Sequence, residues 1–128
     1  MEEHHIKKEY IALVQGHTNY KNKKIISNIA RDRHNAKKMI IHPNGKESVS
    51  IFNTLKNYKD CSLIQVTILT GRKHQIRVQC ASLNHHILND SLYGGKKIDN
   101  TGLLLQSHHI QFNDVDITCP QEKRFIRK

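Results

Sequence analysis

The sequence contains few cysteines, and its N-terminal residues form no apolar run. The three cysteines, Cys61, Cys80 and Cys119, are odd in number, widely spaced and without a C-x-x-C pair. This pattern argues against a disulfide framework and against a structural zinc site, so we expect buried thiols. Residues 1–9 are mostly charged or histidine, with a single isoleucine, and cannot form a signal peptide or a membrane span. We therefore expect a cytoplasmic protein without membrane association.

Acidic residues are scarce relative to basic ones. The chain has 21 Lys and Arg against 11 Asp and Glu, which gives a formal charge of +10 with all ten histidines neutral. Such a field attracts polyanions and favours a nucleic acid as partner. The alternative is a solvated basic surface, or a composition in which Lys, Asn and Ile are all frequent. Composition alone leaves both interpretations open.

Adjacent histidines occur three times, at residues 4–5, 85–86 and 108–109. They suggest a metal site, because imidazole is a common ligand of transition metals. Neighbouring side chains on a strand or a helix point in different directions, however, so two adjacent histidines rarely bind one ion. We therefore expect no metal.

The length of 128 residues is that of one domain or part of one, and the chain has no internal repeat or obvious linker. β-Branched and apolar runs predict several strands separated by polar turns, and we favour a strand over a poor helix for residues 46–58. The expected strands are residues 10–14, 24–26, 37–41, 46–58, 63–69, 103–112 and 115–118. Strands with little intervening helix predict an α+β fold, a mostly antiparallel mixed sheet with one main packed helix.

Residues 71–77, Gly-Arg-Lys-His-Gln-Ile-Arg, form the most informative segment. They follow an expected strand, and Ile76, Cys80, Leu83 and Ile87 then recur at helical spacing, so a helix is predicted over 76–87. This strand-to-helix corner carries three cationic side chains, an imidazole and an amide, which are suited to binding anions. The backbone N–H groups at the start of a helix also bind anions. The alternative is surface charge without a contact.

Several segments carry a family resemblance in their order and spacing. Residues 8–16 read KEYIALVQG, and residues 69–78 read LTGRKHQIRV. The first resembles the K-x-Y-x-A-x-V-x-G strand of the RluA-type pseudouridine synthases, and the second resembles their L-x-T-G-R-x-H-Q-I-R-V segment. Shorter similarities lie at Arg31, at residues 45–50 (G-K-x-A-x-T), at 89–94 (G-D-x-x-Y-G) and at 103–107 (L-x-L-H-A). The resemblance covers nearly the whole chain.

The resemblance implies an enzyme that isomerises uridine to pseudouridine in ribosomal or transfer RNA, without cofactor or metal. An aspartate is the nucleophile in this family, and the target nucleotide must leave its stack. By motif, Arg77 corresponds to the arginine that pairs with the catalytic aspartate, and Tyr10 to the tyrosine that lies against the base. The alternative for Arg77 is a structural salt bridge. A guanidinium would keep the carboxylate ionised, and a phenol ring offers a surface for stacking. The RNA-contacting residues expected beside them are Arg72, Lys73, His74, Gln75 and Ile76, with His74 hydrogen-bonded inside the corner.

The sequence departs from the family pattern where the nucleophile belongs. An R-L-D-x-x-T-S-G segment precedes the tyrosine strand in the family, whereas the nine residues before Tyr10 contain no aspartate. Asp90 matches a loop residue of the family, and we expect a turn role for it rather than that of the nucleophile, because nothing in the sequence places it opposite Arg77. Residues 1–128 are therefore expected to be a partial pseudouridine synthase catalytic domain, its C-terminal portion, monomeric and inactive alone. The alternative is a non-catalytic RNA-binding remnant of such an enzyme.

Overall fold

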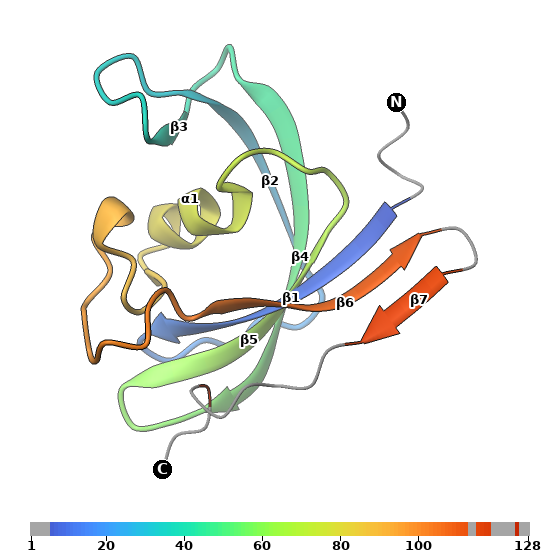
Figure 1. Ribbon diagram of the computed structural model, residues 1–128, viewed down its shortest axis with the longest axis vertical. Coiled ribbons are helices and arrows are strands. Elements are labelled where there is room, and N and C mark those ends of the chain that lie inside the picture. Colours follow the sequence, from blue (N-terminus) through green and yellow to red (C-terminus); the bar gives the residue numbers. More distant parts are fainter. Residues whose placement is uncertain (1–5, 113–114, 119–124, 126–128) are drawn as a thin grey trace.

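The computed structural model, which describes residues 6–112, 115–118 and 125, contains one antiparallel sheet with a single α-helix against it (Figure 1). The seven strands are arranged in the order β3-β2-β4-β5-β1-β6-β7, and every neighbouring pair is antiparallel. This confirms the expected α+β fold. The elements are β1 (Ile6–Gln15), β2 (Lys23–Arg31), β3 (Met39–Ile41), β4 (Lys46–Asn57), β5 (Cys61–Ile68), α1 (Gln75–Ser82), the 3₁₀ turn η2 (Ser91–Tyr93), β6 (Leu105–Phe112) and β7 (Val115–Thr118).

The two central strands, β1 and β5, are buried on both faces, as their nearly continuous apolar runs require. On one face, side chains of both strands pack with Ile76 and Cys80 of α1, and on the other face they pack with Leu88 and Phe125. The apolar residues that the two strands contribute are Ala12, Val14, Ile64, Val66 and Ile68 on the helix side and Ile11, Leu13, Cys61 and Leu63 on the other. The core is therefore built around β1, the strand that carries Tyr10.

The helix is shorter than the apolar spacing predicted. It ends at Ser82, and Asn84 adopts the left-handed conformation with φ of 63°, which stops a helix. Ile87 lies in an extended segment that forms a bridge with Val14 of β1. Ile87 is buried in the same core as Ile76 and Cys80. The apolar spacing therefore predicted the burial of Ile87 correctly, but the prediction that Ile87 is helical was wrong.

The strands follow the prediction with shifted ends. Residues 46–57 form β4, which confirms the strand over the helix at this position, while β3 covers only Met39–Ile41. Cys61 and Cys80 are buried, as expected, and the expectation for Cys119 lies outside the described residues. Residues 4–5 of the histidine pairs also lie outside them, and among the described positions no group of three or more His, Cys, Asp or Glu residues could hold a metal ion. In the part of the chain with assigned structure, no helix is long and apolar enough to cross a membrane.

Candidate functional site

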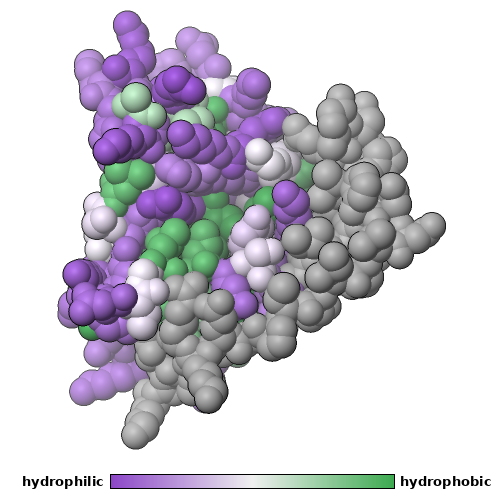
Figure 2. Space-filling model, viewed as in Figure 1, coloured by the Kyte–Doolittle hydropathy of each residue, from purple (hydrophilic) through white to green (hydrophobic). Residues whose placement is uncertain are grey.

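A cavity of about 260 Å³ lies where β1, the end of β5 and the start of α1 meet the segment that leads into β6. Its lining includes every predicted site residue except Lys73. The lining residues are Tyr10, Ile68, Arg72, His74, Gln75, Ile76, Arg77, Leu103 and Leu105. We call this space the tyrosine–arginine cavity. Figure 2 shows a hydrophobic area in the middle of the face of the molecule that it depicts, with hydrophilic residues above it and to its left.

Arg77 is held by a bidentate ion pair with Asp90. Its Nε donates to Oδ2 of Asp90 at 3.0 Å, and its Nη2 donates to Oδ1 at 2.7 Å. The side chain of Asp90 is 1% exposed and that of Arg77 is 19% exposed, so the pair is largely shielded from water. Nothing in the sequence placed Asp90 opposite Arg77, whereas the structure does so. Asp90 does begin the η2 turn, as its turn chemistry suggested, but its carboxylate points to the helix.

The loop that carries Asp90 depends on two glycines. The backbone carbonyl of Asp90 accepts hydrogen bonds from the N–H groups of Tyr93 and Gly95, which closes the turn. Gly94 has φ of +89°, a conformation that L side chains rarely adopt, and a Cβ at Gly95 would lie 2.0 Å from the carbonyl oxygen of Ile87. This tight geometry turns the Asp90 carboxylate toward α1.

Tyr93, which the sequence reasoning treated only as part of a turn motif, is a second partner of Arg77. Its ring centroid lies 5.1 Å from Cζ of Arg77 and 5.4 Å from Nζ of Lys38. Its hydroxyl accepts a hydrogen bond from the Met39 N–H at 2.9 Å and lies 2.8 Å from Nδ1 of His74. Arg77 is thus fixed by a carboxylate and by an aromatic ring, and the D-x-x-Y spacing of residues 90–93 was the available signal.

His74 connects this arrangement to the corner before α1. Burial and the nearby charges of Arg77 and Lys73 lower the pKa of His74, while burial raises the pKa of Tyr93. The imidazole is therefore neutral near pH 7 and the phenol is protonated, so the Tyr93 hydroxyl can donate to Nδ1 of His74. His74 is thus hydrogen-bonded within the protein, but its partner Tyr93 lies in η2 and not inside the corner, where the sequence had placed the bond.

The side-chain amide of Gln75 makes its hydrogen bonds within the protein. Its Oε1 accepts hydrogen bonds from the Thr70 hydroxyl at 2.8 Å and the Arg72 N–H at 3.2 Å, and its Nε2 donates to the Val49 carbonyl at 3.0 Å and the Ser50 hydroxyl at 2.7 Å. Gln75 is 3% exposed. These contacts attach the corner to β4 and leave the amide without spare capacity on its oxygen.

Tyr10 is half-buried on β1, and burial raises the pKa of its phenol, so the ring carries no charge near neutral pH. It lines the same cavity as Arg77. Among the described lining residues none has a carboxylate, and Asp90 is almost fully buried with both oxygens on Arg77. The cavity combines a flat aromatic surface and a fixed guanidinium.

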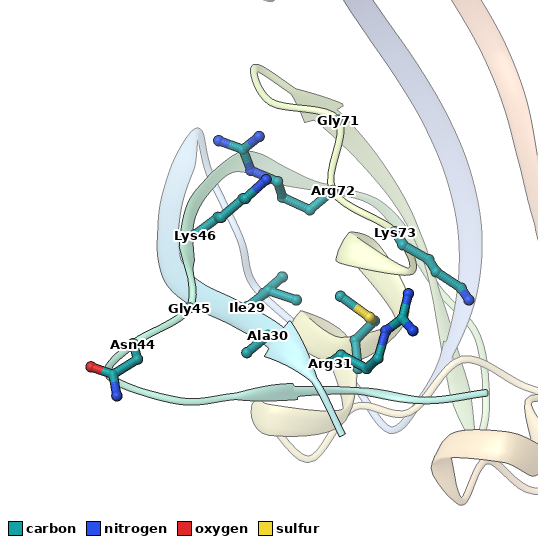
Figure 3. Close-up of a pocket in the computed structure, with 10 residues that line it drawn as sticks. Ile29, Ala30, Arg31, Asn44, Gly45, Lys46, Gly71, Arg72 and Lys73 are labelled. Atoms are coloured by element: carbon teal, nitrogen blue, oxygen red, sulfur yellow. The ribbon is translucent and has the colours of Figure 1, made fainter. Parts of the chain in front are cut away.

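Lys73 lies at a neighbouring cavity of about 480 Å³, which we call the basic cavity (Figure 3). Arg72 lines both cavities, so the two adjoin. The basic cavity is lined by Ile29, Ala30, Arg31, Met39, Asn44, Gly45, Lys46, Gly71, Arg72 and Lys73.

Comparison with known proteins gives a consistent result. The sequence model of the RNA pseudouridylate synthase family matches residues 1–82. The "Ribosomal large subunit pseudouridine synthase C" of Buchnera aphidicola subsp. Baizongia pistaciae is 43% identical over 101 residues, which cover 77% of this chain and 32% of that protein. The "Ribosomal large subunit pseudouridine synthase D" of Borreliella burgdorferi is 36% identical over 124 residues, covering 93% of this chain and 36% of that protein.

Among solved structures, "Human RNA Pseudouridylate Synthase Domain Containing 1" superposes with a TM-score of 0.82 at 25% sequence identity, over 93% of this chain and 56% of that one. The chain spans about a third of the length of the two bacterial relatives. The family match covers well over half of the chain and agrees with the fold of the solved structure. This chain belongs to the RNA pseudouridylate synthase family.

Proposed function

We propose that this chain provides the uridine-binding part of a pseudouridine synthase that acts on ribosomal or transfer RNA. The observation that carries the proposal is that Tyr10 and Arg77 line one cavity, with Arg77 fixed by Asp90. The domain is then the C-terminal portion of a catalytic domain, and the activity belongs to the whole enzyme.

The roles follow from the geometry of the cavity. A uridine turned out of its stack lies against the Tyr10 ring, which replaces part of the stacking energy that the base loses. The guanidinium of Arg77 has five N–H donors, and its ion pair with Asp90 uses two of them. The remaining donors face a catalytic carboxylate, keep it ionised and fix its oxygens near the sugar.

The reaction is an isomerisation, so atoms and electrons balance without a co-reactant. The carboxylate acts as nucleophile while the bond between N1 of the base and C1′ of the sugar breaks, and the base turns. C5 then bonds to C1′ and loses its proton, and N1 gains a proton, so the product is an isomer of the substrate. We propose that the aspartate comes from polypeptide outside these 128 residues, because residues 1–9 contain no aspartate and the described lining of the cavity contains no carboxylate.

The remaining predicted residues have three different roles. Gln75 and Ile76 position the corner, since the amide of Gln75 is bonded to the protein and Ile76 is 5% exposed in the core. His74 supports Arg77 through Tyr93. Arg72 and Lys73 contact RNA phosphates, as expected for cations at a partly open cavity.

A second function fits the same cavity. Because no carboxylate is found among its described lining residues, the chain could bind RNA without any chemistry, as a non-catalytic remnant. The nucleotide sequence before the Met1 codon distinguishes the two functions. A continuous reading frame that encodes an Arg-Leu-Asp segment supports the enzyme, and a stop codon in that frame supports the remnant.

Tritium release from RNA labelled at C5 of uridine tests where the nucleophile lies. The exchange of the C5 hydrogen accompanies the isomerisation, so we expect the 128-residue chain alone to release no tritium. Measurable release would show that the nucleophile is within this chain and would contradict its proposed origin elsewhere.

Binding of a single-stranded RNA oligomer tests the uridine pocket itself. Tyr10→Phe keeps the ring and is expected to bind within about twofold of the unmodified chain. Tyr10→Ala removes the stacking surface and should weaken binding by roughly 5- to 150-fold, the equivalent of ~1–3 kcal/mol per stacked base. Circular dichroism of both variants controls for folding. Equal affinity of a folded Tyr10→Ala variant would reject the pocket.

A further inference from the structure

The basic cavity gathers four cationic side chains from three segments that are distant in the sequence. Arg31 ends β2, Lys46 begins β4, and Arg72 and Lys73 lie in the corner between β5 and α1. Of the lining residues that the structure describes, none is acidic. Figure 3 shows Lys46 and Arg72 on one side of Ile29 and Ala30, and Arg31 on another, with Lys73 farther along the rim. Positive charge is therefore more concentrated around this cavity than an even distribution of the basic residues over the surface would give.

The backbone around this cavity is fixed rather than loosely attached. Ile29 of β2 pairs with Lys46 of β4, and a Cβ at Gly45 would lie 2.6 Å from the backbone C and 2.7 Å from the backbone N of Ile29. The turn before β4 thus packs directly on β2. On the other side, Nε of Arg72 donates to the carbonyl of Glu47 at 3.1 Å, which attaches the corner to β4. These contacts hold the cationic residues at set positions.

The composition of the lining suits a phosphodiester better than a base. Lysine and arginine bind phosphate by charge and by multiple N–H donors, whereas the cavity has no aromatic ring in its lining to stack on. Ile29, Ala30 and Met39 form apolar walls, and an apolar wall strengthens the attraction between a cation and a phosphate. The ligand class is therefore a sugar–phosphate backbone.

Arg72 connects the two cavities. Because it lines both, a strand whose flipped-out uridine occupies the tyrosine–arginine cavity runs past Arg72 toward the basic cavity. We propose that the basic cavity binds the phosphates of the RNA strand beside the target uridine, with Arg31 and Lys46 as contacts additional to Arg72 and Lys73. This inference rests on the proposed function for the position of the uridine.

The salt dependence of RNA binding tests the inference. The probe is a fluorescein-labelled single-stranded oligouridylate, titrated with the full chain between about 50 and 200 mM salt, where phosphate contacts have a large effect. Each single-strand phosphate contact contributes roughly 0.7 to the slope of log affinity against log salt. The double variant Arg31→Gln, Lys46→Gln should reduce the slope by about 1.4 and weaken binding several-fold at the lowest salt.

Lys59→Gln is the control for the loss of a single charge elsewhere on the surface. Lys59 is an exposed lysine in the turn between β4 and β5, at the opposite end of β4 from Lys46, so its substitution removes one charge at a distance from the basic cavity. We expect its slope to equal that of the unmodified chain. Arg31 and Lys46 are also exposed, and glutamine at either position is compatible with folding, which circular dichroism checks.

The outcomes separate this inference from the proposed function. An unchanged slope in the double variant, together with weaker binding by Tyr10→Ala, overturns the phosphate site and leaves the uridine pocket standing. A reduced slope with normal binding by Tyr10→Ala rejects the uridine pocket and, with it, the position of the phosphates beside a target uridine. A slope reduction in Lys59→Gln that is half of that in the double variant, and so the same for each charge removed, shows an effect of net charge only and overturns the inference.

Discussion

Arg77 is fixed more firmly than its position at a cavity wall requires. The bidentate pair with Asp90 sets the plane of the guanidinium, and the Tyr93 ring covers it at 5.1 Å. Burying an aspartate and an arginine together costs desolvation energy that their attraction only partly returns, so such a pair contributes little to stability. We infer that the pair exists to orient Arg77, and that the fixed guanidinium is what the cavity needs.

Asp90→Asn tests this reasoning at the level of one residue. The substitution preserves the shape of the side chain but leaves the partly buried Arg77 without its counter-charge, which is far more costly than removing a whole ion pair. We expect the free energy of unfolding in urea to fall by about 3 kcal/mol. Asp60→Asn, at an exposed turn position, serves as the control and should change stability by less than about 0.5 kcal/mol.

The double variant Arg77→Met, Asp90→Leu completes the test. If the loss in Asp90→Asn arises from the unpaired guanidinium, replacing both partners with apolar side chains should recover most of the stability. RNA binding by the double variant should be weaker than that of the unmodified chain, because Arg77 no longer supplies a guanidinium. A stability loss in Asp90→Asn no larger than in Asp60→Asn would contradict the account of the pair.

The sequence identified one half of this arrangement. The resemblance of residues 69–78 pointed to Arg77, and that of residues 8–16 pointed to Tyr10; the structure brings both side chains to one cavity, while their catalytic roles stay predictions. Asp90 was missed as a partner because it lies 13 residues from Arg77 along the chain, across a loop whose course depends on the backbone at Gly94 and Gly95. Local turn propensity gives the turn but not the direction of its carboxylate.

At the scale of elements, α1 is oriented by a polar network rather than by apolar contacts alone. The Ser50 hydroxyl of β4 donates to Oε1 of Gln79 at 2.6 Å and receives a hydrogen bond from Nε2 of Gln75. Gln79 is completely buried. A satisfied network in the interior allows few alternative positions of the helix, so it fixes the corner that carries Arg72 and His74. Strand and helix positions were predictable from apolar patterns, but this helix-to-strand attachment was not.

The end of α1 gives the prediction at this scale. Asn84 has φ of 63°, and a left-handed residue costs roughly 1–2 kcal/mol unless it is glycine or, to a lesser degree, asparagine. We expect Asn84→Gly to stabilise the protein by up to about 1 kcal/mol and Asn84→Ala to destabilise it by about 1 kcal/mol. Urea unfolding of the three proteins measures both differences. Equal stability of the alanine and glycine variants would show that the helix end does not require this conformation.

At the scale of the whole molecule, burial decreases from the centre of the sheet toward β3. β5 is buried along nearly its whole length, whereas β3 has three residues and pairs only with β2 among the described strands. Tyr10 and the neighbouring wall of its cavity belong to the central strands, but Arg31 and Lys46 lie close to β3, since Arg31 pairs with Met39. The tyrosine–arginine cavity is thus built on the most buried part of the molecule and the basic cavity on a less buried part.

Amide hydrogen exchange measured by NMR can test this gradient. Ala12 and Ile64 pair with each other in the central strands and are completely buried, so their amides should exchange only when the whole protein unfolds. The amides of β3 that pair with β2 should exchange faster, through local opening that exposes little apolar surface. Urea well below the unfolding midpoint should accelerate exchange at Ala12 and Ile64 but barely affect β3, because only global opening exposes a large area. Equal rates and equal urea dependence across the sheet would mean that β3 opens only together with the core.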